Sequence, residues 1–162
     1  MSIDSDVRYA GFWRRLAAGL IDTVLFGLLS VILLTLLYGA DHFSQALEQG
    51  PASYHGIGDF FIENVLPILL VTWCWVKYRG TPGKLLLECK VVDAKTGEGL
   101  TVGKAVLRYF GYYISLIPIG LGFLWIAWDR RKQGFHDKIA GSVVIITSDR
   151  EDSLDEMMKE LP

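Results

Sequence analysis

The sequence predicts an all-α polytopic membrane protein with two firm transmembrane helices, a third bent or re-entrant apolar segment and a small cytoplasmic β element. Three observations lead to this fold class. Of the 162 residues, 51% are hydrophobic and 12% are aromatic. Three apolar runs, residues 16–38, 60–76 and 105–128, have lengths typical of membrane segments. Basic residues flank the start of the first run, the end of the second and both ends of the third, where they are expected beside a bilayer.

The first apolar run, residues 16–38, is long enough to cross a hydrocarbon core of ~30 Å at ~1.5 Å per residue. Acidic residues precede it and it exceeds the length of a signal-peptide core, so we expect it to remain as an anchor. It contains one charge, Asp22, about two helical turns after Arg15. Arg15, Ala18, Gly19 and Asp22 therefore share one helix face, which we expect to contact protein rather than lipid.

The second run, residues 60–76, is shorter, and Pro67 is expected either to bend it or to open its first turn. Lys77 and Arg79 follow it directly, whereas the loop of residues 39–59 has no Lys or Arg. The positive-inside bias thus predicts a cytoplasmic N-terminus and places this first loop outside.

The segment between the second and third runs is too polar to span a membrane. Thr81-Pro82-Gly83 is expected to interrupt any helix. Lys90–Asp93 is typical of a strand, followed by a glycine-containing turn and a returning segment that ends at Leu100. Residues 141–147 form another strand-like run near the C-terminus. We expect this run to pair with Cys89–Val92 in a small cytoplasmic sheet.

The third run, residues 105–128, has basic residues at both ends, so one straight span would place one basic flank outside. It is too short for two spans, and Pro118-Ile119-Gly120 crosses its centre. A bent or re-entrant segment that turns at Pro118–Gly122 satisfies both constraints, with a simple third span as the alternative. The membrane domain should then cover residues 8–147, and residues 148–162 form an acidic tail.

Asp22 is the strongest candidate for a functional residue, because an acid inside lipid is costly and is retained where something uses it. As a functional group it would bind a proton or a cation. As a structural group it would form a hydrogen bond or an ion pair with Arg15, Arg108 or another basic residue. Arg15 itself reads either as a ligand or as an anchor whose charged end reaches the interface.

Asp129 is, with Asp22 and Arg15, a candidate ion- or proton-binding residue, and Arg108, His136 and Asp137 form a secondary polar cluster. Asp129 is expected to cap or pair with Arg130 or Arg131, and Asp137 to open the following turn. We expect no metal site, because further His or Cys at ligand spacing is missing from the sequence around this cluster. The sequence contains no G-x-S-x-G nucleophile motif and no phosphate-binding loop, so we expect neither an enzyme nor a cofactor, and no nucleic-acid partner.

Four segments, in order, resemble the RDD family of small bacterial membrane proteins: GFWRRLAAGLID, RGTPGKLLLECKVVD, LRYF and GFLWIAWDRRKQGFHDKIAGSVVI. The resemblance covers residues 8–147 and implies a place in the bacterial inner membrane. It implies that Arg15 is the family arginine and Asp22 the first family aspartate. The second aspartate would be Asp129, with Asp137 as the alternative. It also implies transport, since cation/proton antiport is attributed to some members, and a third apolar region that is usually counted as one span.

These observations lead to two hypotheses for the function. The first is a transporter, or a transporter subunit, for protons or monovalent cations, in which Asp22 titrates and Arg15 tunes its pKa. Three spans barely enclose a pathway, so such a transporter would be a homo-oligomer or would work with other membrane proteins. The second is a non-enzymatic membrane scaffold or assembly factor that binds other membrane proteins through the face of Ala18 and Gly19.

Overall fold

The computed structural model describes residues 7–39 and 57–147, so most of the predicted outer loop and the acidic tail lie outside the described residues. Within these ranges the chain is mostly helical, with two helices that are long and apolar enough to cross a membrane and up to three if a bent pair counts as one span. A two-stranded sheet completes the fold. The predicted fold class is confirmed.

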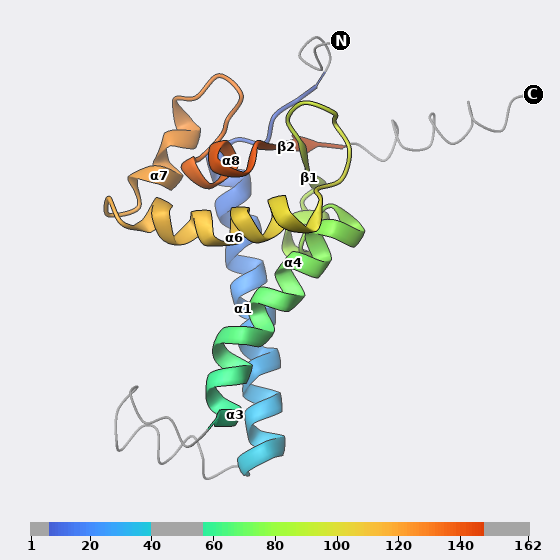
Figure 1. Ribbon diagram of the computed structural model, residues 1–162, viewed down its shortest axis with the longest axis vertical. Coiled ribbons are helices and arrows are strands. Elements are labelled where there is room, and N and C mark those ends of the chain that lie inside the picture. The colour runs from blue at the N-terminus through green and yellow to red at the C-terminus, as the bar shows by residue number, and fades with distance from the viewer. Residues whose placement is uncertain (1–6, 40–56, 148–162) are drawn as a thin grey trace, which may run out of the picture.

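The first span is α1, Phe12–Tyr38, which forms most of the long stem in Figure 1. Its distribution of side chains is the reverse of that in a water-soluble helix. The four buried residues are Arg15, Ala18, Asp22 and Leu34, whereas most of its leucines are exposed. This reversal is expected for a helix whose solvent is lipid and whose polar face contacts protein.

The second span runs from Ile57 to Tyr78 and is not a uniform helix. It consists of α3 (Ile57–Phe60), the π-helical turn η2 (Phe61–Val65) and α4 (Leu66–Tyr78). Pro67 lies in the first turn of α4 and has no backbone N–H to continue the regular ladder. The widened turn just before it accommodates this break, so Pro67 both opens α4 and marks the irregularity predicted from the sequence.

The third apolar region is bent by 113° between α6 (Val102–Leu116) and the pair α7 (Leu121–Leu124) and η3 (Trp125–Ala127). Ile119 and Gly120 both have positive φ at the bend, inside the predicted turn. In Figure 1, α6 runs across the axis of α1 rather than beside it. The structure therefore confirms a bent segment over a simple straight third span.

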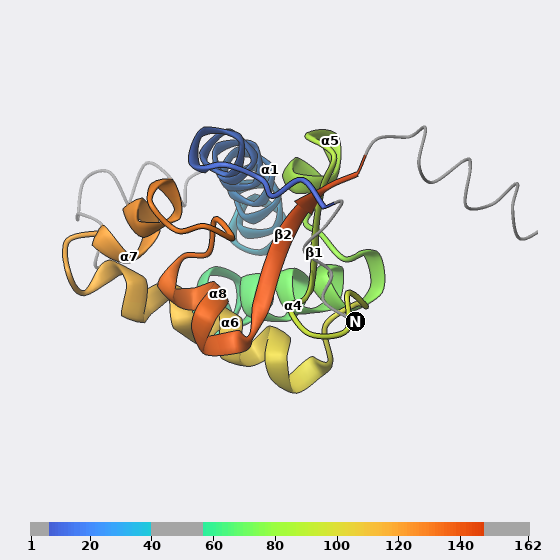
Figure 2. The same cartoon turned by 90° about the horizontal axis from the view of Figure 1, so that it is seen from above.

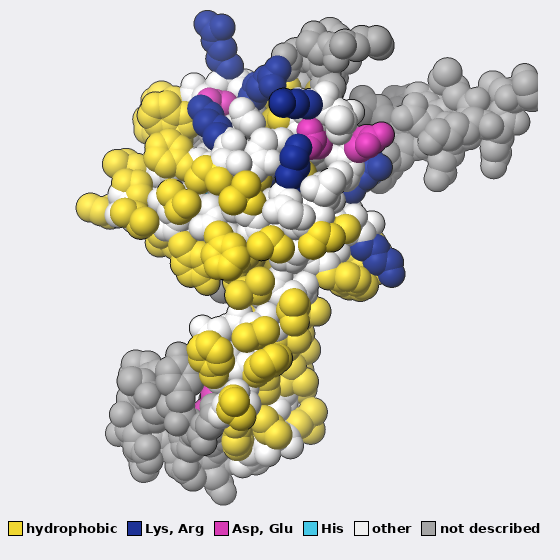
Figure 3. All heavy atoms as spheres, in the orientation of Figure 1, with side chains coloured by type: hydrophobic (Ala, Val, Ile, Leu, Met, Phe, Trp, Pro, Cys, Tyr) yellow, Lys and Arg dark blue, Asp and Glu magenta, His cyan; other side chains and the backbone are white. Residues whose placement is uncertain are grey.

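The two faces of α6 differ in chemistry. One face is buried and partly polar, with Ala105, Arg108, Gly111 and Ser115. The other face is exposed and apolar, with Leu107, Phe110 and Ile114, and the exposed Ile117 follows directly after the helix. Figure 3 shows hydrophobic side chains gathered below α6 and down the stem. An exposed apolar face on a helix that buries an arginine indicates that α6 is turned toward lipid.

The predicted sheet is confirmed as an antiparallel pair of β1 (Cys89–Asp93) and β2 (Ser142–Ile146), with Cys89 opposite Ile146. The N-terminal segment adds to its other edge, because Ala10 N donates to Val144 O and Ile146 N donates to Arg8 O. Two short helices, α5 (Pro82–Leu86) and α8 (Phe135–Ala140), lie beside the sheet (Figure 2). The buried apolar cluster here comprises Ala10, Trp75, Cys89, Val91, Leu100, Ala105 and Val144.

Candidate functional site

Asp22 is buried, with 7% of its surface exposed, and its carboxylate is held by the turn that leads into α5. The backbone N–H of Gly83 donates to Oδ1 at 2.7 Å, and the hydroxyl of Thr81 donates to Oδ2. The ammonium of Lys84 lies 3.5 Å from Oδ2. The basic partner of Asp22, which the sequence left open, is thus Lys84.

The position of this turn depends on Gly83. A Cβ atom at Gly83 would lie 2.3 Å from the backbone oxygen of Ala18 and 2.9 Å from Oδ1 of Asp22. Only a residue without a side chain allows α5 to approach α1 closely enough for its backbone N–H to reach the carboxylate. Pro82 fixes the start of α5, so the sequence Thr81-Pro82-Gly83-Lys84 presents three donors to one acid.

The second buried carboxylate, Asp137, lies between two arginines from different helices. Its Oδ2 is 2.5 Å from Nη1 of Arg15 on α1, and its Oδ1 is 2.5 Å from Nη1 of Arg108 on α6. The backbone N–H of Gly134 also donates to it, at 2.9 Å. Asp137 is fully buried, so this cluster joins α1, α6 and α8 through ion pairs that are shielded from water.

The electrostatics around α8 fix its charge states. Burial alone would raise the pKa of Asp137, but the guanidiniums of Arg108 and Arg15 outweigh burial and hold that pKa well below its usual range. Burial lowers the pKa of the neighbouring His136 to about 3, with the same cations adding to the effect. At neutral pH the cluster therefore contains an ionised Asp137 and a neutral His136.

Several predicted site residues lie elsewhere than the sequence suggested. Arg15, expected to tune Asp22, donates to Asp137 and to the backbone oxygen of Ala10. Asp129 lies outside the buried cluster; its Oδ2 accepts the backbone N–H of Arg131, in line with the predicted cap, and its Oδ1 forms an ion pair with Lys138 at 2.5 Å. Within residues 7–39 and 57–147, no three His, Cys, Asp or Glu side chains come together as a metal site.

Two residues that complete the site, Thr81 and Lys84, were not among the sequence candidates. They lie in the segment RGTPGK, where the sequence alone indicates only a break in the apolar pattern and one part of the family resemblance. The sequence feature that points to this site is Lys84 directly after Pro82-Gly83, in a turn expected at the membrane surface. The sequence does not show that α5 packs against α1, and this packing is what brings Lys84 to Asp22.

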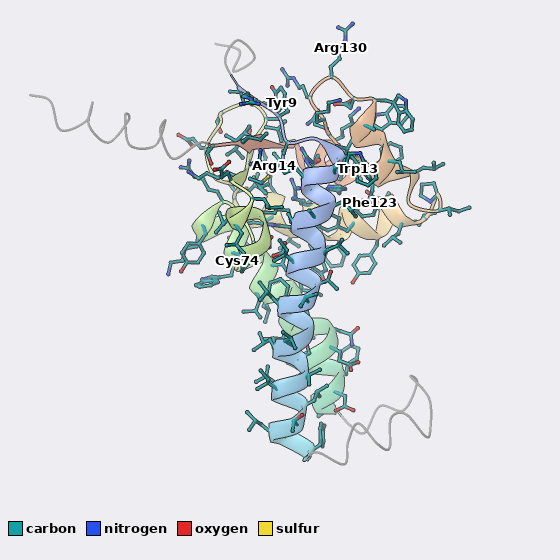
Figure 4. All side chains as sticks on the ribbon, turned by 180° about the vertical axis from the view of Figure 1, so that it is seen from behind. Tyr9, Trp13, Arg14, Cys74, Phe123 and Arg130 are labelled. Carbon is teal, nitrogen blue, oxygen red and sulfur yellow. The ribbon has the colours of Figure 1, made fainter. Side chains whose placement is uncertain are left out.

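A cavity of about 910 Å³ lies beside α1, between it and the α6–α7 bend. Asp22 lines the cavity directly. Asp137 does not line it, but its two partners, Arg15 and Arg108, do. Figure 4 labels Phe123, another lining residue, on the side of α1 where α7 lies. Its remaining wall is mainly apolar and follows α1 along Gly19, Thr23 and Gly27.

Comparison with known proteins gives a consistent result. The model of the RDD family matches residues 9–141. The chain is 30% identical to the Bacillus subtilis uncharacterized protein YxaI, over 84% of this chain and 96% of that protein. It is 31% identical to the uncharacterized protein RP437 of Rickettsia prowazekii, over 64% of each chain. It is 28% identical to the Bacillus subtilis uncharacterized membrane protein YteJ, over 85% of this chain and 80% of that protein. No solved structure matches.

Proposed function

The chain belongs to the RDD family and is an integral membrane protein, and from this premise we propose that it is a transporter, or one subunit of a transporter, for protons or monovalent cations. Asp22 is the proposed ion site. The observation that supports this choice is that Asp22 lines the large cavity and has a lysine, not an arginine, as its charged partner.

A transport site must exchange its positive partner during a cycle. Lys84 lies 3.5 Å from Asp22, a longer separation than the 2.5 Å between Asp137 and each arginine. A lysine ammonium on a flexible stem can withdraw, and a proton or a cation can then take its place on the same oxygen atoms. Thr81 and Gly83 would hold the carboxylate in position through that exchange.

We also propose that the N-terminus and the sheet face the cytoplasm. Between Arg15 and Lys77 the sequence has no Lys or Arg. In Figure 3 the basic side chains gather around the end of the molecule that carries the sheet, and Figure 4 shows Arg130 pointing outward from that end. The positive-inside bias supports this orientation. Two spans and one bent segment barely enclose an ion pathway. Transport therefore favours a homo-oligomer or assembly with other membrane proteins.

The test is ion flux in proteoliposomes that contain only this protein. Wild type should move protons or a monovalent cation down an imposed gradient, and Asp22→Asn should abolish that flux while remaining folded. Asp129→Asn is the matched control, because Asp129 also pairs with a lysine but outside the buried cluster, and its flux should equal that of wild type. Equal flux in Asp22→Asn and wild type would contradict the proposal.

The second candidate function is a non-enzymatic scaffold that packs against another membrane protein. Ala18 is already covered within the chain by Gly83, but the space beside Gly19 is open. Small residues on a membrane helix allow a second helix to approach closely. If wild type moves no ion under any gradient, while Gly19→Leu abolishes co-purification of a membrane partner, the scaffold explains the chain better than transport.

A further inference from the structure

The cavity beside α1 has a cationic end and an apolar wall, an arrangement that neither ion transport nor helix packing requires. We propose that it binds one anionic phospholipid from the surrounding bilayer. The phosphate would lie at the end lined by Arg15, Lys84 and Arg108, and an acyl chain would run along the face of Gly19, Thr23 and Gly27. This goes beyond the proposed transport function and does not depend on it.

The charge at the polar end supports an anion. Arg15, Lys84 and Arg108 contribute three positive charges, and Asp22 and Asp137 contribute two negative ones. These five side chains together have one positive charge in excess, in a region largely removed from water. An uncompensated buried charge is costly, and one phosphate diester would neutralise it.

Unpartnered donors lie at the same end of the cavity. Nη2 of Arg15, Nε of Arg108 and Nε1 of Trp75 are buried N–H groups with no acceptor among the described residues. The three side chains line the cavity and are 8%, 1% and 0% exposed, respectively. Buried donors are nearly always satisfied in folded proteins, and phosphate oxygens are strong acceptors for guanidinium groups. Three such donors around one cavity indicate a ligand with several anionic or polar oxygens.

The apolar wall fits a chain rather than a compact anion. Gly19, Thr23 and Gly27 recur about once per helical turn on one face of α1, and a Cβ at either glycine would meet nothing within 4 Å. Phe123 and Leu124 line the cavity from α7. A helix from another protein would cover this wall but would bring no anion to the cationic end, so the excess charge favours a lipid.

The proposal is tested by native mass spectrometry of the full chain in detergent with added phosphatidylglycerol or phosphatidylcholine of identical acyl chains. We expect one bound phosphatidylglycerol and a preference over phosphatidylcholine of roughly tenfold, the effect of one well-placed ionic contact. Inorganic phosphate at the same concentration should not displace it, because it lacks the acyl chain.

Cavity-filling variants locate the bound lipid. Gly19→Leu and Gly27→Leu should each lower the phosphatidylglycerol occupancy by roughly tenfold. The matched control is Gly103→Leu, a helical glycine with equally open surroundings that lies on α6 outside the cavity lining, and it should bind like wild type. Lys84→Gln should reduce the preference for the anionic lipid, whereas Lys77→Gln, at the end of α4, should not.

Two results would overturn the proposal. The first is equal binding of the two lipids by wild type, a measurement that needs no variant. The second is unchanged phosphatidylglycerol occupancy in Gly27→Leu when its thermal unfolding matches that of wild type. No ion gradient is used, so loss of lipid binding and loss of transport are separate outcomes.

Discussion

The regions around Asp22 and Asp137 each bury one carboxylate but hold it in different ways. Asp137 lies between two arginines at 2.5 Å and is fully buried. Asp22 has one lysine at 3.5 Å, a threonine and a backbone N–H, and it lines the cavity. Arginine does not lose its proton in proteins and binds carboxylates in a fixed geometry, whereas lysine is a flexible point charge.

The difference separates a permanent charge from an exchangeable one. The cluster of Asp137 connects α1, α6 and α8 and is expected to keep its charges under all physiological conditions. The region of Asp22 connects α1 and α5 through contacts that survive if the ammonium leaves. We therefore expect changes near Asp137 to act on stability, and changes near Asp22 to act on function as well.

The largest effect should come from Asp137→Asn. The change leaves Arg15 and Arg108 buried without a counter-charge, which should destabilise the protein by about 3–5 kcal/mol. The measurement is thermal unfolding in detergent, followed by fluorescence-detected size exclusion. Asp129→Asn is the control, because its partner Lys138 is half exposed, and it should cost less than about 1 kcal/mol. Equal effects of the two changes would remove the distinction between the cluster and the surface.

The next effect tests the region of Asp22 through packing. Gly83→Ala would place a methyl group 2.3 Å from the Ala18 oxygen, so α5 must move away from α1 at a cost of about 1–3 kcal/mol. The same melting experiment measures it. Gly103→Ala, in open space on α6, should instead be neutral or stabilising by up to about 1 kcal/mol. A neutral Gly83→Ala would show that α5 does not need this close approach.

A third, smaller effect is a pH dependence of the free energy of unfolding, which we expect from His136 beside Asp137. The pKa of His136 is about 3 in the folded state and near 6.5 when unfolded. Between these values the unfolded chain binds one more proton, so stability should fall as the pH falls from 6.5, by at most about 1.4 kcal/mol per pH unit. Melting curves at pH 7, 6 and 5 measure this slope. His136→Asn should have a shallower slope, and an unchanged slope would assign the effect to other groups.

The smallest effect should come from Arg14→Gln. Arg14 pairs with Glu88 at 2.7 Å, but both side chains are more than a third exposed. We expect a loss below about 1 kcal/mol, which added salt would reduce further. Arg15→Gln, one residue along, should cost several times more because it leaves Asp137 with a single arginine. A comparison of their melting temperatures at two salt concentrations checks both statements.

Local features of the fold could be predicted from the sequence. The β-branched run after Gly141 and the strand at Cys89 indicated the sheet, and Pro118 with Gly120 indicated the bend. These signals lie within a few residues of the structure that they specify. The charge pattern added the one non-local argument, that both flanks of the third run should lie on the same side.

The pairing inside the site could not be predicted in this way. Asp22 and Arg15 share a helix face, so local spacing associated them, but each is paired with a residue from another element. Asp129 and Asp137 lie in similarly charged surroundings in the sequence, and only the packing of α8 against α6 buries one of them. Burial depends on contacts between distant segments, and sequence spacing does not report those.

The edge pairing between Arg8–Ala10 and β2 has a consequence for biogenesis. These residues precede the first span and emerge from the ribosome early, whereas their partner strand is the last described element. Arg15 likewise meets Asp137 across 122 residues of sequence. During synthesis its charge therefore remains unburied and available to hold the inserting helix at the membrane surface. Arg15 meets its carboxylate partner only when α8 has been made, so we expect a chain truncated before α8 to leave this arginine unpaired.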